Sequence, residues 1–239
     1  MMASSGLHME MILLLTIRPN RSLALGNAVL LLLGLVCPVA AHNGAVAIAV
    51  PLEGIEIDGD LSDWPADLEI YPIRQNVDPY GPTDLRGVDL DTSADFSPEF
   101  TVGYSLEEQL VYVAVRVRDD QVRTGISLMN TDDSEIYLGT HQGGYQATYL
   151  MCPEGGSTVS SGNNPALHLL GTGNDLDLER TRSWGAVRQS GGLLTYEWGL
   201  QLLGSSLQDT LQLKAGMTLS FDVVAADRDA DEGPPSWVS

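Results

Sequence analysis

The feature that most constrains the fold is a nine-residue run at 110–118 in which every second residue is valine. Val111, Val113, Val115 and Val117 fall on one face of an extended chain, and the opposite face carries mixed side chains. A two-residue period over this length predicts a β-strand with one buried face. The valine face needs a second apolar layer to cover it, which favours a sandwich or a barrel.

Other stretches repeat this pattern. Residues 100–104 alternate in the same way and reach 110–118 through a polar turn at 105–109, which predicts an antiparallel hairpin. Five apolar residues share one face of a later strand: Leu194, Tyr196, Trp198, Leu200 and Leu202. Further candidate strands are 54–57, 68–73, 135–138, 145–151, 184–189 and 219–225, and turn-rich loops occupy 76–97 and 153–165. We predict an all-β fold, an antiparallel β-sandwich of immunoglobulin-like or jelly-roll type, in a single domain.

The first 41 residues have the pattern of an export signal. Arg18 and Arg21 precede an apolar run at 23–36, and small residues end the segment at Ala41. The run is short for a membrane span, which needs roughly 20 residues. We therefore predict a signal peptide at 1–41, a domain at 42–239, and a secreted or periplasmic protein of bacterial type. The alternative is that the segment is retained, with 23–36 as a membrane anchor.

The charge balance excludes one class of partner and favours one cation. The chain has 12 basic and 32 acidic residues, for a net charge of −20. Such a surface repels phosphate backbones, so we predict no nucleic-acid binding. Clustered carboxylates attract Ca²⁺, which prefers oxygen ligands. The predicted structural calcium sites are two acidic runs: Asp58, Asp60 and Asp63, and Asp227, Asp229 and Asp231. For each run, the alternative is a solvated acidic turn.

No catalytic motif is present. The histidines beyond residue 41 are His42, His141 and His168, and none has a close metal-ligand spacing. The chain also lacks the G-x-S-x-G sequence of a hydrolase nucleophile. A pair of glycosidase carboxylates needs a set separation in space that sequence cannot show. We predict a protein that is not itself an enzyme, although it would suit the binding module of a larger glycoside hydrolase or signalling enzyme.

Three stretches together resemble a known family. They are the I-D-G-D-L-S-D-W sequence at 57–64 with the apolar residues before it, the hairpin at 100–120, and residues 194–200 leading to 216–223. In order and spacing they are similar to carbohydrate-binding module family 9 and its relatives in the DOMON-like group. The resemblance covers about 50–239. It implies a non-catalytic β-sandwich that binds a mono- or oligosaccharide or a glycan end between aromatic side chains and holds structural calcium.

The aromatic residues supply the candidate sugar site. Trp184 has polar neighbours and is the first candidate, followed by Tyr145, Trp237 and Trp64. Flat rings pack well on the C–H faces of sugars. Trp64 ends the family-like turn, and the alternative for it is a plug at one end of the sandwich.

Two other functions fit the resemblance. One is an extracytoplasmic sensor domain of a longer kinase or cyclase, which requires 23–36 to remain a membrane anchor or a further span beyond Ser239. A strand that starts near Trp237 indicates that the domain is truncated at its C-terminus. The other is a haem-binding DOMON-like module, with Met129 or Met151 and His141 or His168 as axial ligands.

Overall fold

The computed structural model describes residues 11–15, 46–73, 96–124, 131–140, 147–153, 157–161, 182–204, 209–227 and 236–238. Within these residues the regular secondary structure is β-strand, apart from one turn of 3-10 helix, η1 (Leu61–Asp63). None of the described helical structure is long and apolar enough to cross a membrane.

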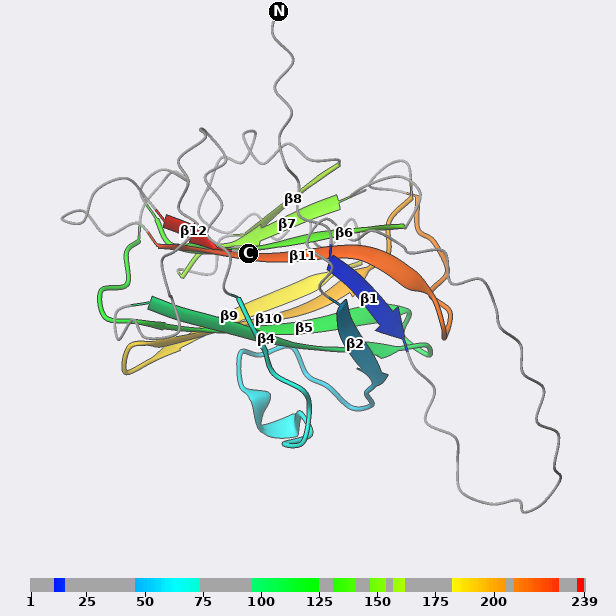
Figure 1. Cartoon of the computed structure of the whole chain (residues 1–239), viewed down its shortest axis with the longest axis horizontal. Coiled ribbons are helices and arrows are strands. Elements are labelled where there is room, and N and C mark those ends of the chain that lie inside the picture. Colours follow the sequence, from blue (N-terminus) through cyan, green and yellow to red (C-terminus); the bar gives the residue numbers. More distant parts are fainter. Residues whose placement is uncertain are drawn as a thin grey trace, which may run out of the picture.

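The strands form two facing layers (Figure 1). One layer contains β8 (Ser157–Ser161), β7 (Ala147–Met151), β6 (Asp133–Thr140) and β11 (Thr218–Asp227), with β12 (Ser236–Val238) paired to β11. The other contains β4 (Phe96–Ser105), β5 (Leu110–Asp119), β10 (Leu193–Gln201) and β9 (Trp184–Ser190), with β3 (Tyr71–Pro72) paired to β4. Neighbours within each layer are antiparallel. The predicted all-β sandwich is therefore confirmed.

Two strands join the layers along one side. β1 (Met11–Leu15) pairs with β11, and β2 (Val46–Pro51) pairs with β4, while β1 and β2 pair with each other. The β1–β2 and β2–β4 pairs are parallel, so this side differs from the antiparallel pairing in the rest of the fold. β1 lies inside the segment predicted to be a signal peptide.

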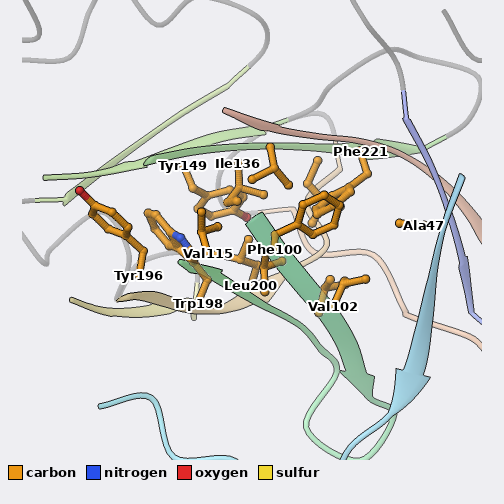
Figure 2. Packing of buried hydrophobic residues seen from close by; sticks show 14 of the residues in the cluster. Ala47, Phe100, Val102, Val115, Ile136, Tyr149, Tyr196, Trp198, Leu200 and Phe221 are labelled. Carbon is orange, nitrogen blue, oxygen red and sulfur yellow. The ribbon is translucent and has the colours of Figure 1, made fainter. Parts of the chain in front are cut away.

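The apolar faces of the two layers meet in one core (Figure 2). Val115 and Tyr196 are opposite each other in the register of β5 and β10, and both side chains are buried. Phe100 of one layer meets Phe221 of the other edge to face, with ring centroids 5.8 Å apart. Tyr149 and Trp198 make a similar contact at 6.4 Å. The alternating residues of 110–118 and 194–202 therefore form one wall of the core, as predicted.

Several predicted boundaries were wrong. No strand forms at 54–57, since the strand lies earlier, at β2, where Val46 and Ile48 are exposed and Ala47 and Ala49 are buried. All four residues are apolar, so this alternation of burial is invisible in the sequence. The predicted strand at 68–73 is reduced to β3, and β8 lies inside the predicted loop at 153–165. The strand expected at the end of the chain is present as β12.

Candidate functional site

β9 presents one face to the core and the other to the outside. A β-carbon added at Gly185 would lie 2.3 Å from the Met151 Cε atom and 3.2 Å from the Trp198 ring, so this position faces the core. Side chains alternate along a strand, which places Trp184, Ala186 and Arg188 on the outer face. β9 is also an edge strand, because its only partner in the described sheet is β10.

Trp184 is the most exposed of the large apolar side chains on the described surface. Its exposed fraction is 52%. Its register partner on β10 is Gly199, which has no side chain to cover the ring, and the next outward residue along β9 is Ala186. The space over Gly199 is filled by Ile57 and Leu110, which would lie 3.4 Å and 3.5 Å from a β-carbon added there. The exposed ring therefore stands beside this apolar segment on an edge strand, and exposed apolar patches are candidate binding surfaces.

The turn at 58–64 lies against this outer face and is fastened by one carboxylate. Glu197 of β10 is fully buried. Its Oε2 atom accepts hydrogen bonds from the backbone N–H groups of Asp58 (2.9 Å) and Gly59 (2.8 Å), and its Oε1 atom accepts one from Trp64 Nε1 (2.7 Å). Burial raises the pKa of Glu197, and the three N–H donors act against that shift. Figure 1 shows this segment in cyan, on the side of the layer away from β11.

The 58–64 turn also forms an ion pair with β9. Asp60 Oδ2 lies 2.5 Å from Arg188 Nη1, and both side chains are about half exposed. The Arg188 guanidinium lowers the pKa of Asp60, with help from the Ser62 backbone N–H group. Gly59 is needed beside this pair, because its φ is +81° and an added β-carbon would lie 2.9 Å from Arg188 Cβ. The outer face of β9 thus presents Arg188 with its ion pair, then Ala186, then the exposed indole of Trp184.

Trp64 belongs to the interior of the turn. Its exposed fraction is 7%, and its ring meets Tyr112 edge to face at 6.4 Å. Together with Leu52, Ile55 and Leu110 it forms a second, smaller apolar cluster on the outer face of β5 and β10. This burial favours the plug interpretation of Trp64 over a ring that stacks on a ligand.

The three carboxylates of the acidic turn already have partners within the protein. Asp58 Oδ1 accepts the Asp60 backbone N–H, Asp60 pairs with Arg188, and Asp63 Oδ2 accepts the Glu56 backbone N–H. The described residues contain no group of three or more histidine, cysteine, aspartate or glutamate side chains arranged to hold a metal. In the second predicted run, Asp227 is buried at the end of β11, while Asp229 and Asp231 lie outside the described residues. Structural calcium at either run stays a prediction.

The other residues predicted to bind sugar or haem do not gather around Trp184 in the described part of the structure. Tyr145, Met129, His141 and His168 lie outside the described residues. Trp237 is in β12, with its backbone paired to Ala226. Met151 is 1% exposed and packs in the main core. Glu197 and Arg188 were not predicted, because their partners are more than 120 residues away in the sequence and leave no local pattern.

Comparisons with known proteins agree with the fold. No protein-family model matches the chain, and no curated protein matches it either. Among solved structures, a family 9 carbohydrate-binding module from Caldicellulosiruptor kristjanssonii in complex with glucose is similar. It is 15% identical, with 80% of this chain and 84% of that chain covered and a TM-score of 0.54. A module of the same family from that organism, in complex with cellotriose, is 14% identical, with 80% and 82% covered and a TM-score of 0.55. The predicted family 9-like fold is confirmed, and the DOMON-like part of the resemblance stays a prediction.

Proposed function

We propose that this protein is a secreted, non-catalytic carbohydrate-binding module that stacks a sugar ring on Trp184. The observation that carries the proposal is the half-exposed indole on the outer face of the edge strand β9. Support comes from the fold, because two structures with the same architecture are carbohydrate-binding modules in complex with glucose and cellotriose. The export signal predicted at 1–41 supports secretion.

The geometry beside Trp184 suits a polyhydroxylated ligand. Trp184 and Arg188 are four positions apart on the same face, which at about 3.3 Å per residue is a span of roughly 13 Å. The indole offers an apolar surface to sugar C–H groups. At the other end, Arg188 donates hydrogen bonds and Asp60 accepts them, so the pair can serve both functions of a sugar hydroxyl. Ala186 between them has a small side chain, and the turn packs beside it against Val187 and Arg188.

The carboxylates of this face support binding without hydrolysis. Glycoside hydrolysis needs one carboxyl group that is protonated near neutral pH and reaches the glycosidic oxygen. The pKa of Asp60 is lowered by Arg188, so this carboxyl is ionised at neutral pH. The pKa of Glu197 is raised, but its side chain is fully buried and both of its oxygens accept hydrogen bonds.

Substitution of Trp184 tests the proposal directly. A panel of mono- and oligosaccharides that includes glucose and cellotriose is titrated by calorimetry against the wild type, Trp184→Ala and Trp184→Phe. We expect Trp184→Ala to weaken binding at least roughly tenfold, since ring stacking adds about 0.5–1.5 kcal/mol beyond area burial. Trp184→Phe keeps a ring and retains part of the affinity.

The matched control is Leu106→Ala, another exposed apolar side chain, in the turn between β4 and β5. It leaves affinity unchanged, and all variants keep the same unfolding midpoint. Undiminished sugar binding by Trp184→Ala would place the site elsewhere. An absence of binding by the wild type across the panel would refute the function itself.

A further inference from the structure

The pairing of β1 is the least expected feature of the fold, because this strand comes from the segment predicted to be a leader. Its backbone pairs with two strands at once. Leu13 is opposite Ala47 of β2 on one side and opposite Leu219 of β11 on the other. Both registers extend over four residue pairs. β1 is therefore an internal strand that closes one side of the sandwich.

The backbone of β2 depends on β1 for its hydrogen bonds. The N–H groups of Ile48 and Leu52 point toward the β3–β4 side, where they donate to Tyr71 Oη and to the Tyr104 carbonyl oxygen, each at 2.9 Å. Backbone direction alternates along a strand, so Ala47 and Ala49 direct their N–H and C=O groups toward β1. Both residues are fully buried. Buried backbone groups without partners are strongly unfavourable, so this edge requires a neighbouring strand.

Nothing else in the described sheet pairs with this part of β2. Its ladder with β4 contains only Val50 and Pro51, beyond the residues opposite β1. On the other side, residues 219–221 of β11 lie between β6 and β1, so half of their backbone groups face β1. Without β1, two strand edges would face each other across a gap one strand wide. Unpaired edges of this kind accept extended segments.

We propose that the seam between β2 and β11 is a strand-binding slot whose occupant is the chain's own segment Met11–Leu15. The sequence of this segment, Met-Ile-Leu-Leu-Leu, is apolar at every position, as is typical of strands with both faces covered. Leader retention and domain folding are then coupled, because cleavage after Ala41 removes the occupant.

Cross-linking in the full chain tests the register. In a background of Cys37→Ser and Cys152→Ala, the pair Leu14→Cys with Thr218→Cys places two cysteines opposite each other. We expect this pair to form a disulfide under mild oxidation. The control pair, Leu13→Cys with Thr218→Cys, is offset by one residue, which directs the two side chains to opposite faces and prevents the bond. No disulfide in the first pair, or equal yields in both, would overturn the proposal.

Amide hydrogen exchange tests the dependence of the seam on β1. Leu13→Pro removes one N–H donor and disrupts the strand. We expect exchange at Ala47, Ala49 and the β1-facing amides of 218–221 to accelerate at least about fivefold, since a backbone hydrogen bond contributes about 1 kcal/mol. The amides of 219–221 that face β6 are the internal control and keep their protection. Unchanged exchange at Ala47 and Ala49 would refute the slot.

Rescue in trans separates a specific slot from general loosening. A synthetic peptide of residues 8–18, which includes Glu10 and Arg18 for solubility, is added to the full-length Leu13→Pro variant. We expect it to restore protection at Ala47 and Ala49, while the same peptide with proline in place of Leu13 does not. Equal effects of the two peptides would show non-specific binding and refute the proposal. If Leu13→Pro unfolds the whole chain, the cross-linking pairs decide the question alone.

Discussion

Glu197 fastens the 58–64 turn to the sheet, and replacing its carboxylate with an amide tests how much that contact contributes. A glutamine at this position has one acceptor oxygen where the carboxylate has two. In the better orientation of the amide, its oxygen accepts the hydrogen bonds from the Asp58 and Gly59 backbone N–H groups, because Oε2 of Glu197 accepts both of these bonds. The NH₂ group then faces Trp64 Nε1, a donor against a donor. Glu197→Gln thus removes one charge-assisted hydrogen bond and leaves a buried indole N–H without its partner.

The expected loss of stability follows from this geometry. A hydrogen bond to a charged group contributes about 1.5–3 kcal/mol, and relief of the buried charge offsets part of its loss. We therefore expect Glu197→Gln to lower the free energy of unfolding by about 2 kcal/mol at neutral pH. For a chain of about 150–250 residues this corresponds to a fall of roughly 4–8 °C in Tm.

Urea unfolding followed by tryptophan fluorescence measures the change. The matched control is Glu99→Gln, which breaks a partly exposed ion pair with Arg116 and should cost under about 1 kcal/mol. A loss in Glu197→Gln no larger than in Glu99→Gln would refute the anchoring role.

The pH dependence gives a second readout with a definite sign. Burial places the pKa of Glu197 above its ordinary value of 4.5. Its contribution to stability is therefore complete below pH 4.5 and declines as the pH rises through the folded-state pKa. Since glutamine does not titrate, the stability gap between the wild type and Glu197→Gln is widest below pH 4.5 and narrows toward neutral pH. A gap that widens with rising pH would mean that the N–H donors outweigh burial.

Two further predictions concern the turn and the cation. Gly59→Ala should lower the free energy of unfolding by about 1–3 kcal/mol because of the positive φ and the close approach to Arg188. The control is Gly54→Ala, where φ is also positive but no atom lies within 4 Å, and urea unfolding should show a smaller loss there. Equal losses would mean that the contact with Arg188 is unimportant. If Ca²⁺ binds at the 227–231 run, millimolar Ca²⁺ raises the Tm relative to EGTA, since a ligand of the folded state stabilises it. Asp227→Asn then abolishes this rise in Tm, and Asp60→Asn keeps it. A rise lost only in Asp60→Asn would move the site to the first turn.

The main walls of the core could be predicted from the sequence because they alternate apolar and polar residues. β5 and β10 have one buried and one outer face, and their patterns show it. β2 could not be predicted, because the residues on both of its faces are apolar and alternation disappears. β1 was hidden for a different reason, since an apolar segment between charged residues has the same composition as a leader.

The site was only partly accessible from the sequence. The polar neighbours of Trp184 indicated an exposed ring, and the exposed fraction confirms that much, while its ligand stays a proposal. The role of Glu197 could not be predicted. Its partners are 133 to 139 positions away, so only the folded sheet brings them together.

The way the turn is fastened determines which of its residues are free to vary. Two of the three hydrogen bonds to Glu197 come from backbone N–H groups, which every residue except proline possesses. Gly59 and Trp64 are fixed by their own geometry. Asp60 adds its ion pair with Arg188, and the side chains of Asp58 and Asp63 accept backbone N–H groups that shape the turn. Substitutions at the exposed Glu56 and Ser62 would therefore change the surface of the turn while its attachment to Glu197 keeps it in place.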